Sequence, residues 1–159
     1  MEHRIEKGEN VFIHSRAYVA GNVTLGDNAN VWCGACIRGD LAPVKIGGNT
    51  NVQDNATVHV GYNVPCEIGS GVTVGHNAVV HGAKIGNNVL VGMGAIVLDG
   101  AVVEDGAGTL VPPNKVIPAG SVVVGNPYKI VRRADGKDLE SILLNASAYI
   151  ELAKAYRGE

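Results

Sequence analysis

Three histidines lie close together near the middle of the chain, at His59, His76 and His81. Neutral imidazole is a common zinc ligand, with metal–nitrogen distances of about 2.0–2.1 Å. Three imidazoles leave one position of a tetrahedral site open for water, and the metal lowers the pKa of that water to about 7. The three histidines are therefore candidate metal ligands of a site that supplies hydroxide at neutral pH. His3 and His14 are interpreted as incidental.

The elements that position these side chains follow from a six-residue repeat. Aliphatic residues recur at every sixth position, with slips where extra residues intervene. They are Ile13, Val19, Leu25, Val31, Ile37, Ile46, Val52, Val58, Ile68, Val74, Val80, Ile85, Val91, Val97, Val103, Leu110, Val116 and Val122. Gly, Asn and Asp fill the gaps, and these residues tolerate the left-handed backbone of tight corners. A period of six excludes a long helix and a hairpin meander, and it indicates a solenoid of short strands.

The repeat predicts an all-β fold, a parallel β-helix of about six triangular turns in which three hexads make one turn. Successive hexads are named face A, face B and face C, with insertions in residues 38–45 and 59–67. Face B then begins at Leu25, Ile46, Ile68, Ile85, Val103 and Val122. Neighbouring turns should stack about 4.8 Å apart.

This register decides which histidines can meet. His59 and His81 each directly follow a face A valine and lie one turn apart, so their imidazoles should stack and could converge on one metal ion. His76 lies two residues after Val74, on face C. A third ligand can reach the same ion if a neighbouring subunit presents that face.

Charged residues lie one turn before the histidines. Arg38 precedes His59 in the face A column, and Asp54 precedes His76 in the face C column. In a trimer that places face A against face C of the next subunit, Arg38 would oppose Asp54. A bidentate pair of this kind would fix the register of the two subunits, and Asp40 could share the guanidinium.

These residues carry a resemblance to a known family over nearly the whole chain. The segments are Arg38-Gly39-Asp40, Asn51-Val52-Gln53-Asp54-Asn55, His59 and Gly75-His76-Asn77-Ala78-Val79-Val80-His81. Together with the repeat, they resemble the gamma-class carbonic anhydrases. The resemblance implies a homotrimer of left-handed β-helices, each with a C-terminal helix, that hydrates CO2 to bicarbonate at metal sites between subunits. The left hand comes from the resemblance, since crossovers generally favour the right.

The same resemblance implies roles for individual residues. His59 and His81 of one subunit and His76 of the next would bind zinc, with Fe²⁺ or Co²⁺ as alternatives. Gln53 would orient the reacting hydroxide or bicarbonate. The inter-subunit structural residues would be Arg38, Asp40 and Asp54. Active members of the family carry proton-shuttling glutamates in two loops, but residues 40–42 and 59–63 contain none, and Glu67 is a weak substitute. Hydration is therefore expected to be slow, buffer-limited or absent.

From Asp135 to Gly158 the pattern becomes helical, with an apolar stripe at spacings near three and four. The stripe consists of Leu139, Ile142, Leu143, Ala146, Ile150, Leu152, Ala153 and Tyr156. The expected organisation is a β-helix domain over residues 1–127 and a C-terminal helical segment over residues 128–159 that packs on the coil or on a neighbouring subunit. Tyr62, Asn145 and Tyr149 are candidate pocket residues.

Composition narrows the partners. The chain has 159 residues and a net charge of −2, so it offers no basic surface for nucleic acid or anionic membrane. No segment is apolar enough to span a bilayer, and a cytoplasmic location is expected. The chain has three cysteines, Cys33, Cys36 and Cys66. An odd number cannot all pair within one chain, which favours reduced thiols over a disulfide framework. A redox or zinc-ribbon use of the Cys33–Cys36 pair is disfavoured, because no helical pattern follows it and a second pair is missing.

Two other functions remain open at this point. Hexapeptide-repeat trimers also host acyl transfer from acyl-coenzyme A, with one histidine as general base and no metal. The protein could also be a catalytically weak metal-binding trimer, because the loop glutamates are missing. Tight binding of acyl-coenzyme A by metal-free protein would favour the transferase.

Overall fold

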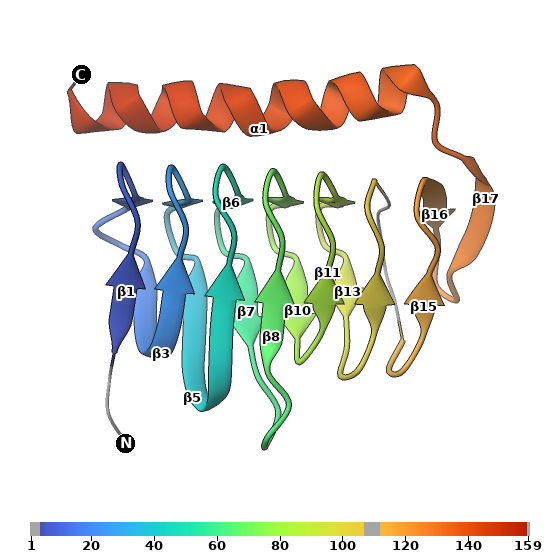
Figure 1. Ribbon diagram of the computed structural model, residues 1–159, viewed down its shortest axis with the longest axis horizontal. Coiled ribbons are helices and arrows are strands. Elements are labelled where there is room, and N and C mark those ends of the chain that lie inside the picture. Colours follow the sequence, from blue (N-terminus) through green and yellow to red (C-terminus); the bar gives the residue numbers. More distant parts are fainter. Residues whose placement is uncertain (1–3, 107–111, 159) are drawn as a thin grey trace.

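The computed structural model describes residues 4–106 and 112–158, and in this part the chain forms a left-handed parallel β-helix of about six turns followed by one long helix (Figure 1). Short strands run in the same direction on successive turns and hydrogen-bond to the turns on either side. The predicted fold class is confirmed. His3 and the repeat position Leu110 lie outside the described residues.

The strands form three faces. Face A consists of β3 (Tyr18–Leu25), β5 (Cys36–Ile46), β7 (Thr57–His59), β10 (Val79–His81) and β13 (Ile96–Val97). Face B consists of β1 (Ile5–Lys7), the second halves of β3 and β5, β8 (Cys66–Ile68), β11 (Lys84–Ile85), β14 (Val102–Val103) and β15 (Val116–Ile117). Face C consists of β2 (Phe12–Ile13), β4 (Asn30–Val31), β6 (Asn51–Val52), β9 (Thr73–Val74) and β12 (Leu90–Val91). The coil ends in an antiparallel hairpin of β16 (Ser121–Val124) and β17 (Lys129–Arg133), and α1 (Gly136–Arg157) follows.

The predicted register is confirmed over most of the coil and wrong in its last turn. Leu25, Ile46, Ile68, Ile85 and Val103 are successive neighbours on face B. Val103 then pairs with Ile117 rather than with a position near Val122. Ile117 is completely buried, whereas Val116 is 56% exposed. The final turn is shorter than eighteen residues, so counting in steps of six placed the last face B residue too late in the chain. Val122 pairs with β17 instead.

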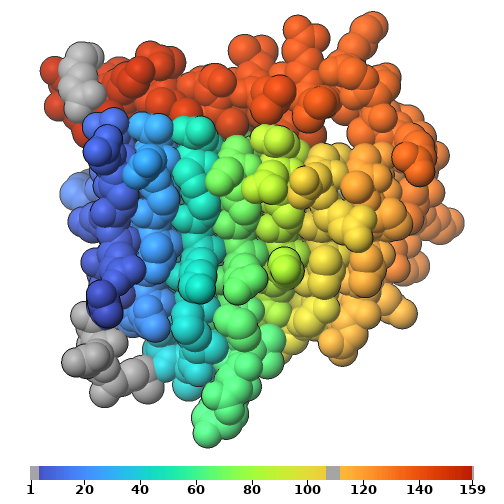
Figure 2. All heavy atoms as spheres, in the orientation of Figure 1, coloured from blue at the N-terminus to red at the C-terminus, as the bar shows by residue number. Residues whose placement is uncertain are grey.

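Both insertions in the repeat lie at the corner between faces A and B. One is the middle of β5, and the other is the loop between β7 and β8, where Gly61 and Val64 form an isolated bridge. Figure 1 shows both protruding on the lower side of the coil, and in Figure 2 the loop after β7 extends furthest from the body. The residues that lead into these insertions, Arg38 and His59, therefore lie on the same edge of face A.

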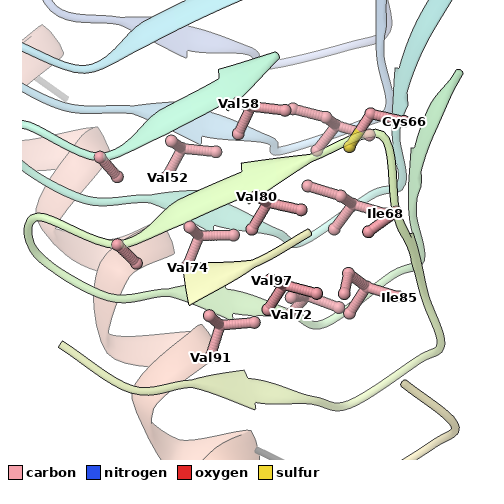
Figure 3. Close-up of a cluster of buried hydrophobic side chains, with 14 of the residues drawn as sticks. Val52, Val58, Cys66, Ile68, Val72, Val74, Val80, Ile85, Val91 and Val97 are labelled. Carbon is pink, nitrogen blue, oxygen red and sulfur yellow. The ribbon is translucent and has the colours of Figure 1, made fainter. Parts of the chain in front are cut away.

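The interior is filled by slim aliphatic side chains, with each face contributing to every layer. Figure 3 shows Val74 of face C, Val80 of face A and Ile85 of face B converging on the axis of the coil. Burying such a side chain completely contributes about 1.5–3 kcal/mol. Cys66 also points into this core, and its burial raises the pKa of the thiol to about 12. The narrow interior explains why only 4% of the residues are aromatic.

Asparagine and glycine form the corners in a left-handed backbone conformation. Asn55, Asn77 and Asn88 have φ angles of 58°, 58° and 51°. Gly34 has a φ of 71°, and a Cβ atom there would lie 2.2 Å from Oδ1 of Asn55 on the next turn. Glycine is therefore favoured at position 34 for two reasons: it tolerates a positive φ, and it leaves room for Asn55 on the next turn.

Helix α1 runs back along the coil over face C, where it contacts β4, β6 and β9 (Figure 1). It begins at the predicted place: Asp135 caps the first turn through its side chain and forms a capping box with Asp138. Ile142, Ala146 and Ala153 of the predicted stripe are buried. Four other members are 43% to 61% exposed, namely Leu139, Leu143, Leu152 and Tyr156, because the helix rests on the face along a narrow strip.

Four of the seven aromatic side chains, Phe12, Trp32, Tyr149 and Tyr156, gather between the helix and the first turns of face C. Trp32 lies 5.1 Å from Phe12, 5.4 Å from Tyr149 and 5.2 Å from Tyr156, measured between ring centroids. These contacts tie the C-terminal half of α1 to the coil. Among the described residues, no helix is both long and apolar enough to pass through a bilayer.

Candidate metal centre

His59 and His81 lie side by side on face A, as the repeat predicts. The two residues are register partners on the neighbouring strands β7 and β10. Nδ1 of His59 is 3.1 Å from Nε2 of His81, and the ring centroids are 5.0 Å apart. The His59 side chain is 15% exposed and that of His81 is 31% exposed. Two imidazoles thus meet at a partly buried surface that remains open to a ligand or a partner.

In each ring, the nitrogen that faces away from the other histidine, here called the outer nitrogen, contacts a carboxylate. Oδ1 of Asp40 is 2.8 Å from Nε2 of His59, and Asp99 contacts Nδ1 of His81. The hydrogen bond from His59 is the main cause that lowers the pKa of Asp40, and the positive charge of Arg38 adds to it. An ionised carboxylate can only accept a hydrogen bond, so in both pairs the ring nitrogen donates.

With both imidazoles neutral, their hydrogen bonds to Asp40 and Asp99 leave a lone pair on each of the two nitrogens that face each other. A neutral imidazole carries one N–H, and the carboxylates take it from both rings, so Nδ1 of His59 and Nε2 of His81 are both acceptors. Two neutral acceptors 3.1 Å apart cannot hydrogen-bond to each other, so this pair needs a shared proton or a metal ion between its nitrogens. Two nitrogens held about 2.0–2.1 Å from one tetrahedral zinc ion would be about 3.3 Å apart, close to the spacing seen here. The donor set of this pair therefore fits a metal ion.

His76 lies at the corner after β9 and does not join the pair within one chain. Its Nδ1 is 3.2 Å from Oδ2 of Asp54, and its Nε2 is 3.3 Å from the hydroxyl of Tyr149. Across residues 4–106 and 112–158, no three His, Cys, Asp or Glu side chains of the single chain are placed to hold one ion. The structure thus brings together two of the three predicted ligands and places the third elsewhere.

Gln53 is nearly completely buried, with 3% of its surface exposed, and it ends a chain of hydrogen bonds. Its Nε2 donates to Oδ1 of Asn51 at 3.0 Å, and Nδ2 of Asn51 donates to Oγ1 of Thr73 at 2.9 Å. Thr73 in turn donates to Oδ1 of Asn145 on α1 at 3.0 Å. The network fixes the Gln53 amide and uses one of its two N–H groups, which leaves Oε1 as an acceptor and the second N–H as a donor.

Of the other predicted site residues, Arg38 and Tyr149 make contacts around the histidines, whereas Tyr62 and Glu67 do not. Arg38 pairs with Asp40 in the same chain, and its predicted pairing with Asp54 of a neighbouring subunit stays a prediction. Tyr149 reaches His76, and burial is the main cause that raises the pKa of its hydroxyl. Tyr62, in contrast, is 79% exposed in the protruding loop. Glu67 lies between Lys45 and Lys84 on face B.

Sequence reasoning missed Asp99 and Thr73 as parts of this site. Asp99 follows His81 by eighteen residues, the length of one turn, so the arithmetic that placed His59 beside His81 could have found it. Thr73 is the face C neighbour of Asn51 and was recognisable by the same count.

Comparison with known proteins agrees with this picture. A model of the bacterial transferase hexapeptide (six repeats) family matches residues 8–39. Carbonic anhydrase of Geobacillus kaustophilus is 38% identical over 150 residues, which cover 92% of this chain and 82% of that protein. Gamma carbonic anhydrase 2, a mitochondrial protein of Arabidopsis thaliana, is 41% identical over 95% of this chain, although the match spans only 58% of the plant protein.

A solved structure has the same fold over nearly its whole length. The crystal structure of a hexapeptide transferase family protein from Anaplasma phagocytophilum aligns with a TM-score of 0.90 and 35% identity, covering 96% of this chain and 92% of that one. The fold, the paired histidines and the relatives agree, and the chain belongs to the gamma-class carbonic anhydrase family of hexapeptide-repeat proteins.

Proposed function

We propose that the protein is a carbonic anhydrase that hydrates CO2 to bicarbonate at metal sites shared between the subunits of a homotrimer. The observation that carries this proposal is the approach of two ring nitrogens, Nδ1 of His59 and Nε2 of His81, to 3.1 Å. Membership of the gamma-class family supports it. Each metal site would take His59 and His81 from one subunit and His76 from the next.

Zinc is the proposed metal, with Fe²⁺ or Co²⁺ as alternatives. When bound, a metal ion of this kind acts as a Lewis acid and brings the pKa of a coordinated water to about 7. The protein's part is to hold the ligands. Asp40 and Asp99 fix the protons of His59 and His81 on their outer nitrogens, and Asp54 holds Nδ1 of His76. Nε2 of His76 would exchange its contact with the Tyr149 hydroxyl for the metal.

Gln53 would orient the reacting oxygen. Its Nε2 donates one N–H to Asn51, so the side chain can still offer Oε1 as an acceptor and the second N–H as a donor. Such an amide can accept from an oxygen that carries a proton, as in water, hydroxide or bicarbonate, and can donate to a bare oxygen of bicarbonate. The link through Thr73 to Asn145 connects this orientation to the position of α1.

Assembly would complete the site. His76 belongs to face C and the other two ligands belong to face A, so a copy that docks face C against face A supplies the third imidazole. Arg38 would then pair with Asp54 of the partner subunit, as the register predicts. Asp40 holds the same guanidinium from within the chain and would keep it in position.

Proton release is the step for which the chain offers least. The two loops that carry glutamates in active relatives contain none here, and Glu67 lies on face B, where its register partners are Lys45 and Lys84. We therefore expect turnover to depend on the concentration of external buffer.

The decisive experiment combines metal analysis and kinetics. Protein purified without oxygen is analysed for metal per subunit, and CO2 hydration is followed by stopped flow with and without added metal over a range of buffer concentrations. The proposal predicts bound metal, trimer mass and a rate that rises with buffer. Protein that binds no zinc, iron or cobalt, or that holds metal without any hydration in strong buffer, contradicts it.

Acyl transfer is the second candidate, and the family model that matches residues 8–39 favours it. The same protein stripped of metal is titrated with acetyl-coenzyme A. Tight binding by metal-free protein would favour the transferase, and bound metal with no hydration would leave a metal-binding trimer of low activity.

A further inference from the structure

Asp99 lies in the corner that follows β13, one turn beyond His81. Its carboxylate contacts Nδ1 of His81, and its side chain is 47% exposed. Its backbone is held at the same time, because Asn114 N–H donates to the Asp99 carbonyl at 2.9 Å and Gly100 N–H donates to the Gly82 carbonyl at 2.8 Å. The carboxylate is therefore anchored to the coil and not carried by a free loop.

Two glycines make room for this carboxylate. A Cβ atom on Gly82 would lie 2.5 Å from Oδ1 of Asp99, and a Cβ atom on Gly61 would lie 3.1 Å from Oδ2. Gly82 also has a φ of 54°. Gly61 in the β7–β8 loop and Gly82 in the turn after β10 thus lie against the Asp99 carboxylate, and at Gly82 a side chain would both collide with it and be strained.

The position of the Asp99 carboxylate decides which of the two ring nitrogens of neutral His81 carries the proton. With Asp99 as acceptor, the ring keeps its proton on Nδ1 and turns the lone pair of Nε2 towards His59. Without Asp99, the proton could move to Nε2 and be donated to Nδ1 of His59, which is 3.1 Å away. The two histidines would then satisfy each other by an ordinary hydrogen bond, and neither facing nitrogen would be free for a metal.

We propose that Asp99 is the positioning residue that prevents this closure and keeps His81 ready to bind metal. This inference rests on the proposed function, because it concerns the same pair of ligands. Asp40 does for His59 what Asp99 does for His81, so the site contains two matched carboxylate–histidine units. Carboxylates that hold the outer nitrogen of a ligating histidine typically contribute 10- to about 100-fold to metal affinity.

The first measurement uses metal-free wild-type protein. The side-chain nitrogen chemical shifts of His81 report which ring nitrogen carries the proton at neutral pH. The proposal predicts a proton on Nδ1 in the wild type, and a shift of the proton towards Nε2 in Asp99→Asn and Asp99→Ala. A wild-type His81 protonated on Nε2 overturns the proposal without any need for a variant.

The second measurement is the dissociation constant for zinc, obtained by competition with a chelator. Asp99→Asn is expected to weaken binding about 10-fold and Asp99→Ala up to about 100-fold. The matched control is Asp105→Asn, because the Asp105 carboxylate also spans one turn but accepts from the backbone of Asn87 at 2.7 Å, away from the histidines. This variant should keep the wild-type zinc affinity even if it melts at a lower temperature.

The outcomes separate the two ideas. Wild-type protein that binds no metal contradicts the proposed function. Wild-type protein that binds zinc, with an equal affinity in Asp99→Ala, overturns the role of Asp99 alone. An equal loss of affinity in Asp105→Asn would assign the effect to general destabilisation and would also overturn it.

Discussion

At the residue scale, the ring nitrogens of His59 and His81 that face each other at 3.1 Å form the proposed metal-binding pair, while neither ring belongs to the hydrophobic core. His81 lies on the outer side of face A, and its side chain is 31% exposed. The variant His81→Ala should therefore lose bound metal while the coil and its assembly persist. Elemental analysis and light scattering on the same sample check this.

The control for His81→Ala is His14→Ala. His14 stacks near Tyr156 and accepts from the backbone of Arg16, far along the coil from the metal pair. This variant should retain its metal. Full metal content in His81→Ala would remove His81 from the site, and loss of the trimer would give it a structural role instead.

Cys66 provides a second prediction at this scale. Burial raises the pKa of its thiol from 9.0 to about 12. In folded protein at pH 8.5 an alkylating reagent should modify no more than Cys33 and Cys36, which are partly exposed, and in urea it should modify all three. Mass spectrometry after short exposure gives the count. Rapid alkylation of Cys66 under native conditions would contradict its place in the core.

The same burial makes stability depend on pH at the alkaline end. The folded protein keeps the Cys66 proton up to about pH 12, whereas the unfolded chain releases it near pH 9.0. The free energy of unfolding should therefore be unaffected by this group below pH 9 and should fall as the pH rises towards 12. Cys66→Ala should remove this part of the alkaline decline.

The sequence predicts which residues become neighbours wherever the repeat fixes the number of residues in a turn. The pairing of His59 with His81 followed from counting turns, and the parallel register of β7 and β10 confirms it. The direction in which each imidazole turns could not follow, because it depends on Asp40 and Asp99, and Asp99 was overlooked. Ring orientation is set by hydrogen bonds that a period of six does not encode.

At the element scale, the start of α1 rests on a group of charges that responds to pH. Arg132 donates to Asp138 through both terminal nitrogens, and the backbone N–H of Asp135 donates to the same carboxylate at 2.8 Å. The hydrogen bonds from Arg132 are the main cause that holds the pKa of Asp138 well below its usual value of 3.8. The stabilisation is therefore present above pH 3.8 and is lost as the pH falls below it.

The expected result is that the helical signal of the protein declines at a higher pH than the β-sheet signal during acid titration. Circular dichroism follows both. In Asp138→Asn the helix should already be less stable at pH 7 and should show a weaker acid dependence. A variant with unchanged acid titration would show that the cap does not control the helix, and Glu151→Gln, at the far end of α1, is the matched control.

The elements themselves were predictable because a period of six leaves few alternatives. The helix boundaries followed from the change of period after Asp135, and the structure confirms them. The last turn was not predictable: Val103 pairs with Ile117 across a shortened turn, and Val116 and Ile117 are both aliphatic. Only burial distinguishes the two, and burial depends on loop length rather than on residue type.

At the scale of the whole molecule, the three faces have different surfaces. Helix α1 covers part of face C, and face B carries the row Lys45, Glu67 and Lys84. Face A exposes Tyr18 on β3 and Ile96 on β13, 59% and 39% respectively, on strands that flank β5, β7 and β10. Face A carries two of the three proposed ligands and face C the third, so contact between faces A and C of two copies would complete the proposed site. Assembly and metal binding should therefore depend on each other.

Arg38→Ala tests that dependence. Its side chain is 43% exposed and its guanidinium is held by Asp40, so removal should leave the fold intact and weaken the proposed contact with Asp54 of the partner subunit. Sedimentation at decreasing protein concentration should show trimers dissociating at higher concentrations than in the wild type, and metal content should fall in parallel because each ion needs two subunits. Arg132→Ala, which loses a pair within one chain, is the control that should dissociate as the wild type does. A trimer of unchanged mass in dilute solution would contradict the bridging role of Arg38, and metal retained by isolated monomers would contradict the shared site.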